Sequence, residues 1–273
     1  LTPKQSLTAQ LLCALSFRLT AAQEKVLAEI FQDLAAQQPM QRLLQGDVGS
    51  GKTIVSALAA LRAIENGYQV AIMAPTEILA EQHYSRFTTW LTPLNIEVAW
   101  FSGSQGKKQR ESELARISTG KAMLAIGTHA LFQDQVAFSR LGLVIIDEQH
   151  RFGVTQRLAL RHKGDRKALV PHQLMMSATP IPRTLAMSYY ADLDVSVIDQ
   201  LPPGRAPIVT KLIDNSRRVE VIQHVREACD TGKQIYWVCP LIEESEVLEL
   251  KTAIETYELL SQHFSDIRVG LVH

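Results

Sequence analysis

Residues 41–67 decide the fold, and their sequence is QRLLQ-GDVGSGKT-IVSALAALRAIENG. The first five residues are typical of a short strand, and the last fourteen repeat apolar side chains at helical spacing up to Gly67. Between them, residues 46–53 fit the pattern G-x-x-x-x-G-K-[ST] at every required position. This order of strand, glycine-rich turn and helix predicts a phosphate-binding loop in an α/β protein.

The residue types in this turn suit a phosphate and its metal ion. Glycines let consecutive backbone N–H groups point inward around an anion, and the following helix directs its positive end at the same place. We expect Lys52 to reach the β- and γ-phosphates and the Thr53 hydroxyl to bind Mg²⁺. The alternative, a glycine turn that only caps a helix, gives no reason for the lysine and the threonine. The expected nucleotide-binding residues of the turn are Gly46, Gly49, Ser50, Gly51, Lys52 and Thr53.

Short apolar runs alternate with helical patterns through residues 1–200. The first helix opens with Thr20 as a plausible N-cap and Gln23 at the capping-box position. This alternation predicts βαβ units and a parallel sheet with helices on both faces. We expect helices at 19–36, 54–67, 76–91 and 107–120, and strands at 41–45, 68–75, 96–103, 121–129, 141–148 and 172–179.

A linker is expected at residues 201–207, LPPGRAP, because three prolines and a glycine suit neither a helix nor a strand. Residues 1–200 would then form a first domain, and residues 208–273 the truncated start of a second α/β domain. The chain begins with Leu1 and not with methionine, which suggests a segment of a longer protein. In the second part we expect strands at 208–214, 233–242 and 267–273, and helices at 217–232 and 246–264.

The composition is ordinary for a soluble α/β protein, with 46% hydrophobic residues and a net charge of zero. No apolar run reaches the ~18 residues that a membrane span needs, and no signal peptide is recognisable. The three cysteines form no CxxC pair, which favours free thiols in a reducing compartment. We therefore expect a cytoplasmic protein without membrane contact. The balanced charge shows no global polycation that would indicate nucleic-acid binding.

An apolar run at residues 143–146 leads directly into two carboxylates, Asp147 and Glu148. In ATPases with a phosphate-binding loop, a strand beside the loop strand ends in an acid at the carboxyl edge of the sheet, where ligands collect. We expect Asp147 to hold Mg²⁺ through water and Glu148 to orient or deprotonate the attacking water. The alternative is a surface turn with two solvated acids, which the complete phosphate-binding motif upstream makes less attractive.

Five short motifs resemble those of superfamily 2 helicases. The segment DEQH at residues 147–150 resembles the DExH box, and the other four agree with it in order along the chain. The resemblance spans nearly the whole chain, and its motifs are highly specific. The other four are FRLTAAQ (17–23), APTEILAEQ (74–82), GTHALFQ (127–133) and SATPIPRTLAM (177–187).

This resemblance implies roles for further residues. Gln23 would read the adenine, and His150 would relay the nucleotide state beside the catalytic residues Lys52, Asp147 and Glu148. A satisfied structural histidine is the alternative for His150. The motif at 177–187 would couple hydrolysis to DNA movement, although Ser177 and Thr179 are also open to a simple turn role. The implied DNA contacts are Thr76, Thr128 and Arg183. Helix capping is the alternative role for each of them. For the two threonines, capping and a DNA contact can coexist.

Within the superfamily, DEQHRFGV, SATPIPRTLAM and ADLDVSVIDQLPPGR are most similar to bacterial ATP-dependent DNA helicases that remodel stalled replication forks and Holliday junctions in recombination and repair. The resemblance implies RecA-like domains, ATP and Mg²⁺ as cofactors, and branched double-stranded DNA as partner. It also implies a monomeric parent whose wedge domain and remaining helicase domains lie outside this chain. Without those domains we expect weak ATP binding and little hydrolysis by the fragment.

Three other hypotheses remain at this point. One is the translocase module of the transcription-repair coupling factor, which shares most of these motifs but has a different linker. Another is a small-molecule kinase with a phosphate-binding loop, which the two-domain layout disfavours. The last is an idle DNA-binding or scaffold module, which the intact Lys52, Thr53, Asp147 and Glu148 disfavour for the parent protein.

Overall fold

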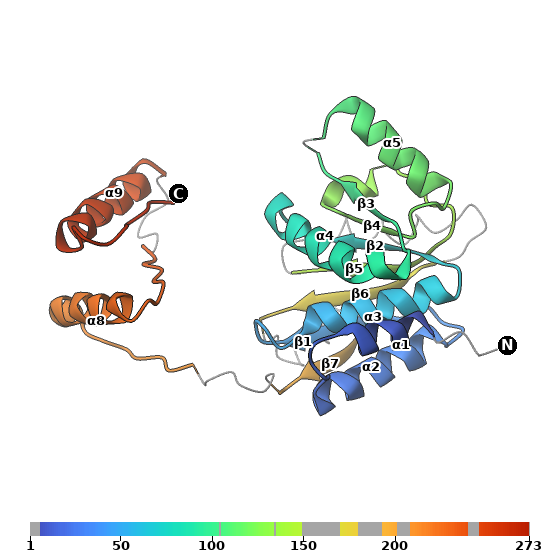
Figure 1. Ribbon diagram of the computed structural model, residues 1–273, viewed down its shortest axis with the longest axis horizontal. Coiled ribbons are helices and arrows are strands. Elements are labelled where there is room, and N and C mark those ends of the chain that lie inside the picture. The colour runs from blue at the N-terminus through green and yellow to red at the C-terminus, as the bar shows by residue number, and fades with distance from the viewer. Residues whose placement is uncertain are drawn as a thin grey trace. The chain divides into compact units, whose positions relative to one another are not determined.

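The computed structural model describes residues 6–103, 105–133, 135–148, 170–179, 193–200, 208–239 and 246–272. The chain divides into two compact units, Leu1–Arg205 and Ala206–His273 (Figure 1). The expected linker at 201–207 lies outside the described residues, so the proposed domain boundaries remain a prediction.

The first unit is built on a seven-stranded sheet in the order β3-β4-β2-β5-β6-β1-β7, and every pair of neighbouring strands is parallel. This confirms the predicted α/β class. All six strands expected in this part of the sequence are present, and β7 is an additional edge strand that we did not predict. The strands are β1 (Gln41–Gly46), β2 (Gln69–Met73), β3 (Val98–Phe101), β4 (Leu124–Gly127), β5 (Leu141–Ile146), β6 (His172–Ser177) and β7 (Asp194–Ile198).

The order of the central strands differs from our expectation in one respect. We expected the acidic strand β5 to lie beside the loop strand β1, but β6 lies between them and pairs with both. Alternation of apolar runs shows which segments are strands, whereas their lateral order depends on how the chain crosses the sheet. The carboxyl ends of β1 and β5 nevertheless reach the same edge, because all three strands run in parallel.

Helices cover the sheet as the alternation predicted. Side chains of α1, α2, α3 and α4 share one core with one face of the sheet, whereas α5 and η2 pack on the other face at β3 and β4. The course of these helices along the sheet can be followed in Figure 1. Of these helices, α1 was not expected from the sequence. The elements are α1 (Leu7–Ala14), α2 (Ala21–Leu34), α3 (Lys52–Glu65), α4 (Glu77–Leu91), the short η1 (Thr92–Leu94), α5 (Lys107–Ser118) and the short η2 (His129–Phe132).

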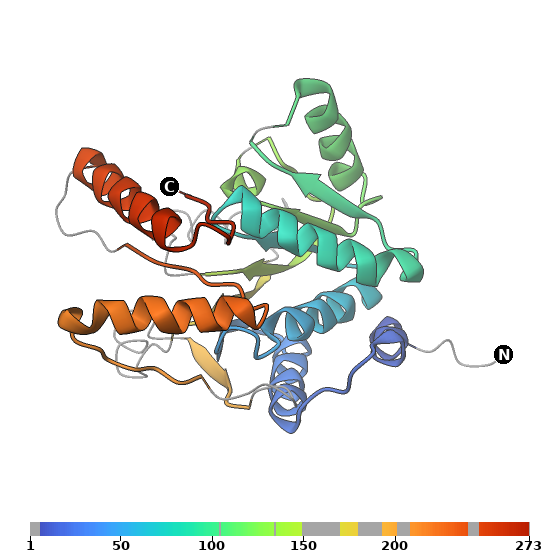
Figure 2. The same cartoon turned by 60° about the vertical axis from the view of Figure 1, so that its left-hand side comes forward.

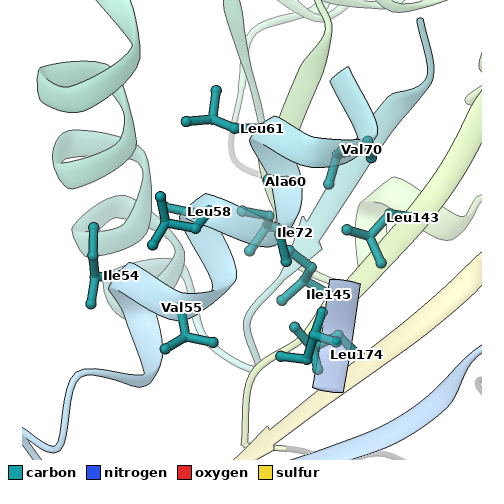
Figure 3. Close-up of a cluster of buried hydrophobic side chains, with 14 of the residues drawn as sticks. Ile54, Val55, Leu58, Ala60, Leu61, Val70, Ile72, Leu143, Ile145 and Leu174 are labelled. Atoms are coloured by element: carbon teal, nitrogen blue, oxygen red, sulfur yellow. The ribbon is translucent and has the colours of Figure 1, made fainter. Parts of the chain in front are cut away.

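The core of this unit explains why its strands are continuously apolar. Figure 3 shows α3 lying over the sheet, with Val55 and Leu58 near Ile72 and Ile145 of the central strands. The alternate residues of the same strands, such as Val144, are also fully buried on the opposite face. Strands that are buried on both faces need apolar side chains at every position, which is the pattern that the sequence shows.

The start of α2 confirms the predicted capping box. The Thr20 hydroxyl accepts a hydrogen bond from the Gln23 N–H at 3.2 Å, and Gln23 Oε1 accepts one from the Thr20 N–H at 2.9 Å. Both donors would otherwise lack a partner in the first turn of the helix. This pair places Gln23 in a fixed position at the beginning of α2.

The second unit contains the two predicted helices, α8 (Arg218–Asp230) and α9 (Glu246–His263), with the short η4 (Asn215–Arg217) before α8 (Figure 2). The strands expected there are not formed within residues 208–239 and 246–272. A strand needs neighbours that satisfy its backbone groups, and these segments pair with none of the described strands. Their apolar side chains are accordingly exposed, by 75% for Val209 and 91% for Tyr236.

The helices and the cysteines bear on the expected compartment. None of the helices in the described ranges combines the length and the hydropathy that a membrane crossing requires. The three cysteines, Cys13, Cys229 and Cys239, are free thiols. The expected cytoplasmic location remains a prediction.

Candidate functional site

The residues selected from the sequence gather at the carboxyl edge of the sheet in the first unit. The strand β1 ends at Gly46 and continues into the glycine-rich loop, while β5 ends at Ile146 and continues into Asp147. Between them, β6 ends at Ser177. In parallel sheets this edge is where ligands bind, so the fold alone already selects this part of the molecule.

The loop between β1 and α3 requires glycine at two positions. The φ angles of Gly49 and Gly51 are +80° and +93°, in the left-handed region that other residues rarely adopt. A Cβ atom on Gly51 would lie only 2.2 Å from Nε2 of Gln23. The loop therefore depends on glycine both for its backbone conformation and for the close approach of α2.

The first turn of α3 has features that suit an anion. The Thr20 hydroxyl caps α2 and the Thr76 hydroxyl caps α4, but no side chain of the described residues caps α3 at Gly51. The first N–H groups of a helix lack acceptors within the helix. The Ser50 hydroxyl is also buried without a hydrogen-bond partner among the described atoms. The loop thus offers donors that a phosphate group would satisfy.

Lys52 lies along the loop and is close enough to the acids for their charges to affect it. Its Nζ donates to the carbonyl oxygen of Gly46 at 2.6 Å and to that of Asp47 at 3.2 Å. Burial lowers the pKa of the Lys52 ammonium from its ordinary value, and the carboxylates of Asp147, Glu148 and Asp47 oppose this shift. The lysine and the acidic pair therefore share one electrostatic environment, as a common phosphate and metal site requires.

Three contacts with described residues hold Asp147. Its N–H donates to the carbonyl of Met73 at 2.8 Å, and its Oδ1 accepts from the N–H of Glu148 at 3.0 Å. Its Oδ2 lies 2.7 Å from Nε2 of His83. Glu148 has a φ of +49°, a backbone conformation that costs about 1 kcal/mol or more for a residue with a side chain. Such strained residues cluster at functional sites, although strain alone assigns no role.

His83 is a residue of this site that our sequence reasoning missed. It lies on α4 with Ala80, Phe87 and Leu91, which are all buried. These positions recur at helical spacing, so His83 is a titratable residue within an apolar stripe that the sequence already displays. That placement was the available signal, because a buried histidine needs a hydrogen-bond partner.

Gln23, the expected adenine reader, contacts the loop in this structure. Its side chain is buried, and Nε2 donates to the carbonyl oxygen of Ser50 at 2.7 Å. The preceding residue is also held, because the N–H of Ala22 donates to Oε1 of Gln200 at 3.2 Å. Gln23 therefore braces the loop against α2, and its role in reading adenine remains a prediction.

The end of β6 carries a pair of hydroxyl groups between the loop and the acids. The Oγ atom of Ser177 lies 2.9 Å from Oγ1 of Thr179, and the Thr179 N–H donates to the same Ser177 oxygen at 3.2 Å. Ser177 is fully buried. This local turn is consistent with the simple turn role that we considered, and it does not test the proposed coupling role.

The expected DNA contacts are only partly described. Thr76 caps α4, since its hydroxyl accepts from the N–H of Leu79 at 3.3 Å. Thr128 precedes η2 without a side-chain cap and is buried, with 4% of its surface exposed, so a direct DNA contact would require this segment to move. Arg183 and His150 lie outside the described residues. The DNA-binding roles of these residues remain predictions.

Comparison with known proteins adds an independent line of evidence. The sequence profile described as DEAD/DEAH box helicase matches residues 20–188. The whole chain is 57% identical to the protein named ATP-dependent DNA helicase RecG of Escherichia coli, and 96% of it is 57% identical to the protein of the same name from Haemophilus influenzae. The chain spans 40% and 38% of the lengths of these two relatives.

A solved structure, described as RecG bound to a three-way DNA junction, has the same fold. It aligns with 94% of this chain with a TM-score of 0.79 and 43% sequence identity. The aligned part is 33% of the solved chain. These likenesses agree with the helicase motifs that were recognised in the sequence.

Proposed function

Because this chain belongs to the DEAD/DEAH box helicase family, we propose that it is the ATP-binding part of a DNA helicase that remodels branched DNA. One observation carries the proposal: the uncapped start of α3, Lys52 and the acidic pair Asp147–Glu148 meet at one edge of the sheet. The similarity to proteins named RecG supports the choice of DNA as substrate. It also favours this hypothesis over the transcription-repair translocase that the sequence left open.

The loop residues would hold ATP by its phosphates. The N–H groups at the start of α3 would donate to the phosphate oxygens, and the buried Ser50 hydroxyl would gain a partner. Lys52 would exchange its two carbonyl contacts for the β- and γ-phosphates. The brace from Gln23 keeps the loop backbone in place during this exchange.

The acidic pair would serve the metal ion and the attacking water. The Thr53 hydroxyl and, through water, the Asp147 carboxylate are the groups that would hold Mg²⁺. When bound, this ion neutralises charge on the phosphate oxygens. Glu148 would orient the attacking water and accept its proton at the carboxylate. His150 completes the set as a proposed relay, by its resemblance to the DExH box alone.

The natural substrate is proposed to be double-stranded DNA with a branch, such as a stalled fork or a Holliday junction. One relative was solved with a three-way DNA junction, which supports this class of substrate. Thr76, Thr128 and Arg183 are the proposed backbone contacts in this chain. A monomeric protein with a wedge domain and further helicase domains is part of the same proposal.

The test is ATP hydrolysis by the whole natural protein with a Holliday junction, with single-stranded DNA and without DNA. We expect the junction to give the highest rate. The variant Lys52→Ala should lower that rate by roughly 10²–10³-fold, because it removes a charge that stabilises the transition state. Lys121→Ala is a matched control, since this lysine precedes β4 at the opposite edge and its side chain is 65% exposed.

Two outcomes would contradict the proposal. Equal rates under the three conditions would remove branched DNA as the substrate class. An unchanged rate in Lys52→Ala, with Lys121→Ala also unchanged, would show that nucleotide chemistry does not take place at this loop.

A further inference from the structure

The helix α4 places the buried imidazole of His83 against Asp147 of the acidic pair. His83 is 7% exposed and lies on the same helix face as Phe87, whose ring is 6.3 Å away in an edge-to-face arrangement. Its Nε2 atom is 2.7 Å from Oδ2 of Asp147. The two residues are 64 positions apart in the sequence, so only the fold brings them together.

The chemistry of this contact has one direction. An ionised carboxylate can only accept hydrogen bonds, so Nε2 of His83 must carry the hydrogen and donate it. The other carboxylate oxygen of Asp147 accepts from the N–H of Glu148, and the Asp147 N–H donates to β2 at Met73. The backbone contacts hold the residue in place, and among the described residues His83 is the side chain from a distant element that bonds the carboxylate and restricts its direction.

We propose that His83 is a positioning residue for Asp147, which sets the direction of this carboxylate toward the metal ion and the phosphates. The inference rests on the function proposed above. Groups that hydrogen-bond a metal-binding carboxylate restrict its rotation, and their removal typically lowers metal affinity or activity by 10–100-fold. A misdirected Asp147 would still carry its charge but would meet the water shell of Mg²⁺ in fewer orientations.

The competing explanation is that His83 has a purely structural role. The structural role and the positioning role predict different effects of substituting His83. A structural His83 would affect the stability of the core around α4 and leave the requirement for Mg²⁺ unaltered. A positioning His83 would raise the Mg²⁺ concentration that supports nucleotide binding. The amide of glutamine places its Nε2 roughly where histidine has Nε2, whereas the shorter asparagine places its amide near the position of Nδ1. Only glutamine can therefore replace the donor to Asp147.

The experiment measures binding of a fluorescent, non-hydrolysable ATP analogue to the whole natural protein while MgCl₂ is titrated. We expect His83→Ala and His83→Asn to raise the half-maximal Mg²⁺ concentration by about 10–100-fold. His83→Gln should bring the half-maximal Mg²⁺ concentration most of the way back to that of the unaltered protein. Binding of the analogue in excess EDTA should be the same in all variants. Thermal unfolding of each variant without ligand shows which of them are folded.

His172→Gln is a control for the loss of a hydrogen-bonded, partly buried histidine elsewhere in the unit. This residue begins β6 at the opposite edge of the sheet, where its Nδ1 accepts from the N–H of Met40 at 3.0 Å. Its Mg²⁺ requirement should equal that of the unaltered protein. If His83→Ala does not fold, the comparison of His83→Gln with His83→Asn decides the question.

The outcomes separate this inference from the function on which it rests. An unchanged Mg²⁺ requirement in His83→Asn, or equal losses in His83→Gln and His83→Asn, would overturn the role of His83 alone. Nucleotide binding by the unaltered protein that does not depend on Mg²⁺ would overturn the proposed function, and this inference with it.

Discussion

The two units of the chain contain similar apolar runs, but the run in the first unit is buried in a strand and the run in the second is exposed. In the first unit, LGLVII at residues 141–146 becomes β5, in which Leu143 and Ile145 are completely buried. In the second unit, KQIYWVC at residues 233–239 forms no strand, and Tyr236 and Val238 are 91% and 79% exposed. The two segments have a similar local preference for a strand. They differ in structure because the first unit supplies neighbouring strands and the described residues of the second unit do not.

The charged residues differ between the units in the same way. In the first unit Arg42 is largely buried and connects β1 to α2 and β7, through Asp33 at 2.6 Å and Ser196 at 2.8 Å. In the second unit Arg217 binds Glu220 one turn further along, and both side chains are exposed. Both arginines bind a carboxylate, so we expect the difference in burial to decide how much each contact contributes to stability.

The largest expected effect compares one apolar side chain from each unit. Leu174→Ala removes a fully buried side chain between β1 and β5, and we expect it to lower the unfolding free energy of the first unit by about 2–5 kcal/mol. Tyr236→Ala should change stability by less than about 0.5 kcal/mol, because its side chain is exposed. Hydrogen exchange of the amides in each unit during a urea titration measures the unfolding free energies of the two units separately. A comparable loss for Tyr236→Ala would show that this residue packs in a core.

A smaller effect is expected from the arginines. Arg42→Ala should destabilise the first unit by roughly 1–3 kcal/mol, because it removes the arginine donor from the buried Ser196 hydroxyl and from the partly buried Asp33 carboxylate. Arg217→Ala should leave the unfolding of its own unit unchanged within error, since solvent screens an exposed pair. The same urea titration gives both values. If both substitutions lowered the unfolding free energy equally, the burial of the arginine would not determine its contribution to stability.

The smallest effect concerns pH. Burial lowers the pKa of the His172 imidazole, with Asp33 opposing the shift, and Nδ1 must stay unprotonated to accept from Met40. The unfolded chain therefore binds a proton more readily than the folded one. The contribution of His172 is complete above its ordinary pKa of about 6.5 and is lost as the pH falls below that value. The unfolding temperature of the first unit should fall less steeply between pH 7.5 and 5 for His172→Gln than for the unaltered protein. Parallel curves of unfolding temperature against pH would contradict this.

Much of the first unit was predictable because its signals are local. The glycine spacing, the capping box of Thr20 and Gln23, and the apolar runs of six strands each depend on a few consecutive residues. The helicase motifs are local as well, and the family match confirms that recognition.

The features that we missed depend on contacts between distant segments. The place of β6 between β1 and β5, the edge strand β7, and the contact of His83 with Asp147 cannot be derived from spacing along the chain. The strands expected at 208–214, 233–242 and 267–273 are not formed in the described residues of these segments for the same reason, since a strand-like sequence does not specify its partners. In the candidate site, the residue types were therefore recognisable, but the residue that orients Asp147 was not.

The position of β6 has a mechanical consequence for the candidate site. The loop strand β1 and the acidic strand β5 are both hydrogen-bonded to β6, so they are separated by two strand spacings, about 10 Å. Widening that gap would require rupture of a continuous ladder inside a buried sheet. If the proposed nucleotide binds here, its binding and release would therefore be accommodated by turns and side chains at the carboxyl edge of the sheet, because the distance between β1 and β5 stays fixed.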